Sequence, residues 1–232
     1  YAQQIFIGIY NFVFAGLIVA ATVFIDARKV KLISFIPAGL SFLGYFIFYY
    51  LVVIRARSQY IAGGEISLSQ FATVFIVDLI LLLIMYAVHL NLKSYFENNK
   101  ILSQFTLWPL VITLYFSFSL ALDHFWVINY AEQGVMSADL LQEAHRMPYT
   151  LLWAVTALIL TVLGTLFNQI QLRQSALFAV IVVLGKLFLH DLSAMNTRER
   201  ALAMTVVGAV LLIIALVYQF NKKKFDALED VQ

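Results

Sequence analysis

The chain contains no cysteine, only 3 prolines, and few charged residues, which make up 12% of its 232 residues. Without cysteine there is no disulfide framework, no thiolate metal site and no cysteine nucleophile. Soluble domains have about 25% charged and about 45–50% apolar residues, whereas 62% of this chain is hydrophobic. This excess excludes a soluble enzyme, a secreted disulfide scaffold and a disordered tail. The net charge of +2 is too small to suggest a nucleic-acid partner.

The apolar residues occur in seven long runs rather than in short alternating segments. A helix needs about 20 apolar residues to cross a bilayer of about 30 Å hydrocarbon thickness, and lipid cannot satisfy the open backbone of other structures. The predicted spans are Ile5–Ile25, Leu32–Ile54, Phe71–Leu90, Ile101–Leu122, Tyr149–Phe167, Ala176–His190 and Ala201–Phe220. The sixth run is short, and we expect its first turn to come from Gln169–Ser175. The sequence therefore predicts an all-α, polytopic transmembrane helical bundle that forms one domain over residues 1–232.

The distribution of Lys and Arg predicts the orientation of this bundle, because short cytoplasmic loops carry an excess of them. One set of helix ends has nine and the other has five. The nine are Arg28, Lys29, Lys31, Lys93, Lys100, Arg173 and Lys222 to Lys224; the five are Arg55, Arg57, Arg146, Arg198 and Arg200. We therefore expect the N-terminus outside and the C-terminus in the cytoplasm. The basic end Lys222–Lys224 is also expected to attract anionic lipid heads.

The longest predicted loop, Asp123–Pro148, then lies outside the membrane. Within it Ser137 is suited to cap a short helix over Ala138–Met147. Asp139 and Glu143 lie in the first half of this helix and His145 and Arg146 near its end, an order that suits the helix dipole. Pro148 stands where the fifth span begins, which is a favoured first-turn position. The sequence predicts an extracytoplasmic loop over residues 123–148 that contains one short helix.

Ionisable residues inside spans are costly, so each of them indicates a partner or a function. Asp78 lies within the third span, and two interpretations stay open: a hydrogen-bonded link between two helices, or a site for a substrate or ion. Lys186 in the sixth span either extends to the headgroups or forms an ion pair with Asp78, Asp123 or Asp191. We expect Asp78 and Lys186 to face the interior and to share one polar network. The predicted polar cluster in the outer leaflet is Asp78, Asp123, His124, Lys186, His190, Asp191, Arg198 and Arg200.

The C-terminal third has a recognisable order of residues. After the span that starts near Leu151, the chain reads Lys186-Leu-Phe-Leu-His-Asp191-Leu-Ser, then Arg198, an apolar span, and Tyr218-Gln219-Phe220. This order resembles the C-terminal end of a large family of uncharacterised bacterial multi-pass proteins, known as predicted membrane proteins. The resemblance implies a location in the bacterial inner (plasma) membrane and a chain that is a short member or part of a longer protein. It implies no established reaction. The short spacing further predicts that Arg198 closes onto Asp191.

Three functional hypotheses are compatible with these features. The first is a module that binds or translocates an envelope component through the polar cluster. The second is a non-catalytic structural subunit that packs against other membrane-protein subunits, with membrane lipids around it. The third is a membrane enzyme that uses Asp123 and His124, or His190 and Asp191, in acid–base chemistry. Nucleotide, dinucleotide, metalloprotease and nucleophile-elbow motifs are absent, and the four histidines are not spaced as metal ligands. No cofactor or metal is therefore predicted.

Overall fold

The computed structural model describes residues 2–25, 27–61, 67–96, 98–130 and 137–229. All regular elements within these ranges are helical. Seven of the helical stretches are long and apolar enough to cross a membrane: Gln3–Val23, Lys29–Ile61, Leu68–Tyr95, Trp108–Tyr130, Met147–Leu166, Ile170–Asp191 and Thr197–Asn221. This confirms the predicted all-α, multi-pass fold with seven spans. The sixth stretch begins at Ile170, so the polar residues before Ala176 do supply its first turn.

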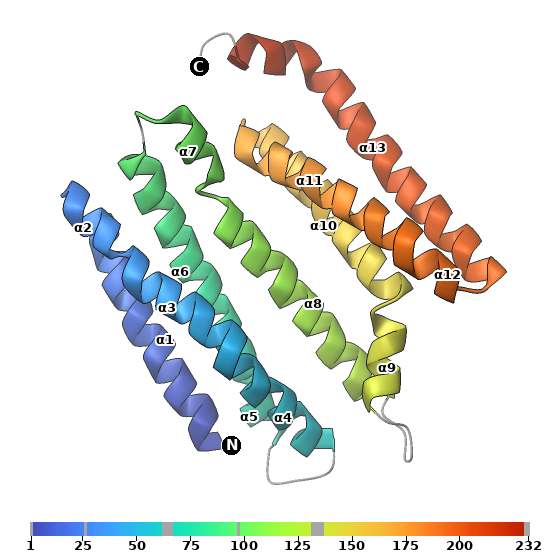
Figure 1. Ribbon diagram of the computed structural model, residues 1–232, viewed down its shortest axis with the longest axis horizontal. Coiled ribbons are helices and arrows are strands. Elements are labelled where there is room, and N and C mark those ends of the chain that lie inside the picture. The colour runs from blue at the N-terminus through green and yellow to red at the C-terminus, as the bar shows by residue number, and fades with distance from the viewer. Residues whose placement is uncertain (1, 26, 62–66, 97, 131–136, 230–232) are drawn as a thin grey trace. The chain divides into compact units, whose positions relative to one another are not determined.

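The helices are shown in chain order in Figure 1. They are α1 (Ala2–Val23), α2 (Arg28–Ile33), α3 (Phe35–Gly44), the π-helical turn η1 (Tyr45–Tyr49), α4 (Tyr50–Ile61), α5 (Leu68–Ala72), α6 (Val74–Tyr95), α7 (Lys100–Phe105), α8 (Trp108–Tyr130), α9 (Ser137–Ala144), α10 (Met147–Leu166), α11 (Ile170–Lys186), the π-helical turn η2 (Leu187–Asp191), α12 (Leu192–Ala194) and α13 (Thr197–Glu229). Two compact units result: unit 1 is Tyr1–Ser117 and unit 2 is Phe118–Gln232. The single domain over residues 1–232 stays a prediction, and each unit is described by itself.

Unit 1 is built on the packing of α1 against α6, with α2 and α3 alongside both (Figure 1). The buried face of α1 carries Ile5, Phe12 and Val19, which are spaced by seven residues and so form one stripe along the helix. In α6 the buried face includes Val77, Leu81 and Ile84. Helices in a membrane associate mainly through such close packing, because lipid is as apolar as the side chains themselves.

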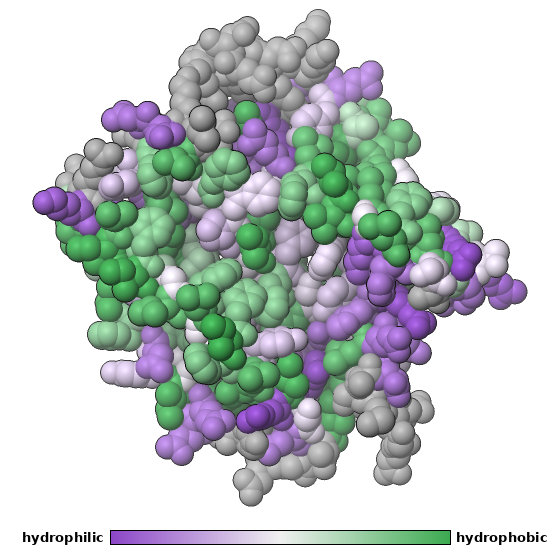
Figure 2. Space-filling model, in the orientation of Figure 1, coloured by the Kyte–Doolittle hydropathy of each residue, from purple (hydrophilic) through white to green (hydrophobic). Residues whose placement is uncertain are grey.

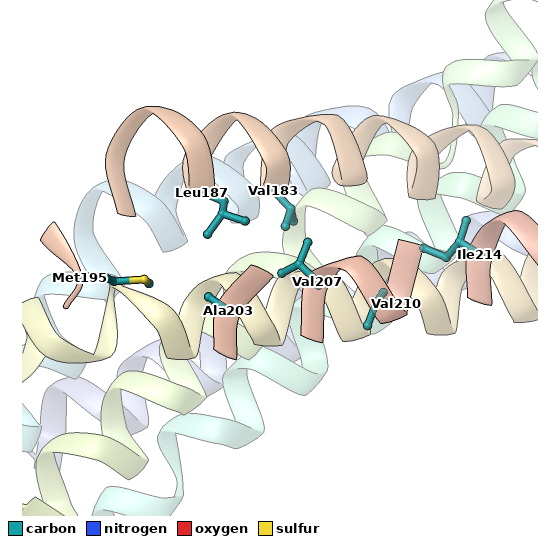
Figure 3. Close-up of a cluster of buried hydrophobic side chains, with 8 residues drawn as sticks. Val183, Leu187, Met195, Ala203, Val207, Val210 and Ile214 are labelled. Atoms are coloured by element: carbon teal, nitrogen blue, oxygen red, sulfur yellow. The ribbon is translucent and has the colours of Figure 1, made fainter. Parts of the chain in front are cut away.

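In unit 2, α10 packs against both α11 and α13. Figure 3 shows the side chains of Val183 and Leu187 directed toward Val207 and Ala203 of α13. This cluster also includes Ala154, Met195, Val210 and Ile214. An apolar seam therefore holds α10, α11 and α13 together in unit 2.

The turn between α10 and α11 is short because its backbone closes a tight C-terminal cap. Asn168 has a φ of 52°, its N–H donates to the Thr165 carbonyl, and the Gln169 N–H donates to the Gly164 carbonyl. These are the two bonds of a Schellman cap, for which Asn is one of the few residues that tolerate the left-handed conformation. Gly164 also allows α11 to approach, because a Cβ there would lie 2.9 Å from the Arg173 backbone nitrogen. The turn thus holds α10 and α11 close together.

The surfaces of both units carry large apolar side chains. Leu189 and Phe220 are 87% and 82% exposed, and Figure 2 shows apolar residues over much of the visible face. Large exposed apolar surfaces are rare on soluble monomers and are expected where lipid surrounds the protein. The pattern agrees with the seven spans.

The predicted fourth span requires a correction. The run expected as one helix over Ile101–Leu122 is divided into α7 and α8, and α8 continues to Tyr130. Pro109 stands in the first turn of α8, where its missing N–H is tolerated, but it would break a helix that continued from α7. Asp123 and His124 therefore lie inside α8 rather than in a loop, and the connection to α9 begins only after Tyr130.

The short helix predicted in that connection is present as α9, but it ends at Ala144 rather than at Met147. Met147 already begins α10, with Pro148 in its first turn as expected. The expected capping role of the Ser137 side chain lies outside the described part of the structure. The orientation of the two termini across the membrane stays a prediction.

Candidate functional site

A buried ion pair lies at one end of unit 2, between Lys186 and Asp191. The Lys186 ammonium donates to the two carboxylate oxygens of Asp191 at 2.7 and 2.6 Å. The side chain of Asp191 is 0% exposed and that of Lys186 is 18% exposed. Thr150 of α10 also takes part, because its hydroxyl donates to Asp191 and lies 3.1 Å from the Lys186 ammonium. This pairing selects Asp191 among the three carboxylates that the sequence offered to Lys186.

The π-helical turn η2 is what brings these two side chains together. They are five residues apart, which in an α-helix places them about 140° apart around the axis. In η2 the Leu192 N–H instead donates to the Leu187 carbonyl, five residues earlier, so the turn is wider. The wider turn brings Asp191 back toward Lys186. Single π-turns inside α-helices are uncommon and often occur at functional positions.

Lys186 also binds the short link between α9 and α10. Its ammonium donates to the backbone carbonyl oxygens of His145 at 2.7 Å and of Arg146 at 3.2 Å. His145 directly follows α9, whereas Arg146 directly precedes α10 and its carbonyl also accepts the Thr150 N–H at 3.4 Å. The lysine therefore joins η2, the end of α9 and the start of α10 at one point.

A second carboxylate, Asp123 of α8, lies at the same end of unit 2. It is 5% exposed. It accepts a hydrogen bond from the Tyr149 hydroxyl at 2.8 Å and lies 3.0 Å from His145 Nε2. The Trp153 indole N–H donates to Ser119, also on α8. These contacts tie α8 to the start of α10.

Each of these two carboxylates is in contact with a histidine side chain. His190 Nδ1 lies 3.1 Å from Asp191, with its side chain 73% exposed, and His145, which contacts Asp123, is 47% exposed. A carboxylate at one ring nitrogen fixes the ring and sets its tautomer. No hydrogen bond to a described residue is found for the other nitrogen of either ring, so each imidazole presents one nitrogen outward.

A cavity of about 310 Å³ adjoins this arrangement. Its lining residues are Trp126, Glu143, Arg146, Met147, Pro148, Met195 and Glu199. Arg146 belongs both to the cavity wall and, through its carbonyl, to the set of Lys186 partners. The indole N–H of Trp126 is buried and finds no acceptor among the described residues. The lining of the cavity thus combines one cationic residue and two acidic residues with Trp126, Met147, Pro148 and Met195.

The predicted residues do not all belong to this site. His124 is buried in α8, and the imidazole that contacts Asp123 is His145. Arg198 is exposed in the first turn of α13, and no ion pair of Arg198 with Asp191 is found among the described residues. That prediction is wrong because both oxygens of the buried carboxylate are already engaged by Lys186 and Thr150. Arg200 instead donates to the Met195 carbonyl.

Asp78 lies in unit 1, where it is 6% exposed and accepts a hydrogen bond from the Tyr45 hydroxyl of η1. This agrees with the interpretation of Asp78 as a link between two helices. Its connection to Lys186 stays a prediction, since the two residues belong to different units.

Sequence reasoning missed three members of the site, namely Tyr149, Thr150 and Trp153, and gave His145 only a helix-end role. A signal was available, because His145, Tyr149 and Trp153 are spaced by four residues and so share one face of a helix. The adjacent Arg146 and Thr150 repeat the same spacing. Among the described residues, no group of three or more His, Asp or Glu side chains is placed to hold a metal ion.

Comparison with known proteins gives one match. The family model described as "Predicted membrane protein (DUF2339)" covers residues 2–220. No curated protein and no solved structure matches the chain. The resemblance seen in the C-terminal third is confirmed, and the match extends well beyond it toward the N-terminus.

Proposed function

The chain belongs to the DUF2339 family of predicted membrane proteins, and we propose that it binds the polar head of an anionic envelope lipid at the cavity of unit 2. Translocation of the same component would be an extension of this binding. If the predicted orientation holds, the cavity lies at the outer leaflet. The membrane implied by the family resemblance is the plasma (inner) membrane.

The observation that carries the proposal is the buried pair of Lys186 and Asp191 beside a cavity lined by charged residues. Removing two charges from water is costly, and an apolar pair of the same volume often gives equal stability. The pair does, however, fix the backbone of Arg146 and the ring of His190. A binding site needs supporting residues that hold its contact residues in place, and the pair of Lys186 and Asp191 can serve in this way.

The lining residues support one class of head group. Arg146 offers donors to a phosphate, whereas Glu143 and the oxygen of Glu199 that does not accept the Asn196 N–H offer acceptors to hydroxyl or amine groups. Because Lys186 and Asp191 neutralise each other, this pair adds no net charge to the cavity. A phosphodiester that also carries hydroxyl groups, as in phosphatidylglycerol, satisfies both requirements, whereas phosphatidylcholine has no hydrogen-bond donors for the glutamates.

A titration with a short-chain lipid tests this proposal. The protein in phosphatidylcholine nanodiscs is titrated calorimetrically with dihexanoyl phosphatidylglycerol and with dihexanoyl phosphatidylcholine, and we expect saturable binding only of the first. Arg146→Gln removes a charged hydrogen bond worth about 1.5–3 kcal/mol, so affinity should fall at least about tenfold. Arg55→Gln is the matched control, since Arg55 is exposed and lies outside the cavity. Equal binding of both lipids, or an unchanged affinity of Arg146→Gln, would contradict the proposal.

A second candidate function is the structural subunit, which one observation in unit 1 favours. Asn11 presents an amide on the exposed side of a spanning helix, and such amides commonly hold transmembrane helices together.

A further inference from the structure

Helix α1 carries a polar side chain near the middle of the membrane. Its span is Gln3–Val23, so Asn11 lies about 12 Å from one end at 1.5 Å per residue. The Asn11 side chain is exposed, and no hydrogen bond of its amide to another described residue is found. Its neighbours Tyr10 and Phe14 are also exposed, and no hydrogen bond from the Tyr10 hydroxyl to Asn11 is found among the described residues. The hydrocarbon of the bilayer forms no hydrogen bonds, so an amide within the span requires a hydrogen-bonding partner from protein.

Asn11 stands in the wall of a groove of about 510 Å³ in unit 1. The α1 residues that line the groove include Gln4, Gly8, Asn11, Ala15 and Ile18, at alternating intervals of four and three residues, with Ile7, Phe12 and Phe14 beside them. This is the spacing of a face that packs along a second helix in a left-handed pair. From Gln4 to Ile18 the groove runs for about 21 Å along the helix, which is most of the span.

The opposite wall comes from α3, η1 and α4. It includes Leu40, Gly44, Phe48 and Val52, which also recur every four residues. Gly44 has open space beside it, because a Cβ there would meet nothing within 4 Å. A small residue at this point leaves room for the backbone of another helix to approach, as at helix contacts in membranes. The groove therefore has the length, the periodicity and the free space for one more helix.

The amide decides which occupant fits best. An acyl chain could fill the apolar length of the groove, but it offers no hydrogen-bonding group near the middle of the bilayer. A transmembrane helix with a polar side chain does. An asparagine side chain both donates and accepts, so Asn11 of a second copy is complementary to it, and a two-fold axis makes the two contacts identical.

We propose that two copies of this chain pack α1 against α1 in this groove, with the two Asn11 amides exchanging hydrogen bonds across a two-fold axis. Each α1 then fills the groove of the other copy beside α3 and α4. The interface is separate from the cavity of unit 2, so it holds whether or not that cavity binds lipid. It also gives the structural-subunit hypothesis a defined contact surface.

Single-cysteine cross-linking tests this interface directly, because the chain has no cysteine of its own. Cysteines are introduced at the groove positions Ile7, Phe14 and Ile18 and at three control positions of α1 outside it, Tyr10, Val13 and Leu17. All six native side chains are at least 39% exposed, so exposure does not separate the two sets. In oxidised proteoliposomes we expect disulfide-linked dimers from the groove positions and monomers from the controls. Dimers from all six positions alike, or only from the controls, would overturn the proposal.

The role of the amide needs a second measurement. Asn11→Leu should raise the dissociation constant of the dimer about tenfold, measured by single-molecule photobleaching over a range of protein-to-lipid ratios. Asn11→Gln keeps a group that donates and accepts and should retain most of the association. Tyr10→Leu, on the neighbouring position outside the groove, should leave association unchanged. A chain that stays monomeric at every ratio, or an Asn11→Leu variant that associates as the wild type does, would refute the proposal.

Discussion

Replacing Lys186 with Met is expected to destabilise the protein by about 3–5 kcal/mol, because it leaves the carboxylate of Asp191 buried without its cation. The same change removes the donor to the carbonyls of His145 and Arg146, so the junction of α9 and α10 loses its tie to η2. Asp191→Leu should be destabilising to a similar extent, because it leaves the Lys186 ammonium without its carboxylate partner. Unfolding of the detergent-solubilised protein, followed by circular dichroism, measures both losses.

The double variant separates a true pair from two independent effects. With Lys186→Met and Asp191→Leu combined, no charge is left uncompensated, so we expect the loss to be smaller than that of either single change. Lys93→Met, at an exposed position of α6, serves as the control and should change stability by less than about 0.5 kcal/mol. Strictly additive losses would mean that the contact between Lys186 and Asp191 contributes nothing specific.

The second large effect is expected in unit 1, where the Tyr45 hydroxyl donates to Asp78. Tyr45→Phe keeps the ring and its edge contacts with Phe12 and Phe116 but removes the donor. A buried acceptor left without its partner costs about 1–3 kcal/mol, and more when it is charged. We therefore expect a loss of about 2–3 kcal/mol in the same unfolding measurement.

A compensating change tests the cause of that loss. Asp78→Leu in the Tyr45→Phe background removes the unsatisfied acceptor, so stability should recover relative to Tyr45→Phe alone. Tyr86→Phe is a matched control, because Tyr86 lies on the same helix as Asp78 but is 50% exposed. If Tyr45→Phe unfolds as the wild type does, the link between η1 and α6 is not a stabilising one.

The spans could be predicted from the sequence because one physical quantity, the thickness of the hydrocarbon layer, sets their length. The fourth span shows where this reasoning ends. Asp123 and His124 interrupt the apolar run, yet α8 continues past them to Tyr130. The carboxylate is tolerated there because Tyr149 and His145 contact it. Tyr149 comes from α10 and His145 from the link before it, and hydropathy along one segment carries no information about them.

The ion pair of the site was foreseen only as one of three alternatives. The α-helical spacing places Lys186 with His190, four residues later, and directs Asp191 to a different face. The wider turn of η2 reverses this, and the sequence Leu187-Phe-Leu-His-Asp191 contains no glycine or proline that would indicate it. Arg198 was assigned to Asp191 on loop length alone, which cannot account for a carboxylate already engaged by residues of η2 and α10.

Accessibility of two introduced cysteines in intact cells tests the central claim, a polar site at the outer face of a seven-span protein. His190→Cys stands beside the buried carboxylate of the site, and Lys93→Cys stands at the end of α6 that is predicted to be cytoplasmic; both positions are exposed. The native chain contributes no background, since it has no cysteine. A membrane-impermeant maleimide should label His190→Cys in intact cells and Lys93→Cys only after permeabilisation. The reverse pattern would put the site on the cytoplasmic face and contradict its assignment to an envelope component.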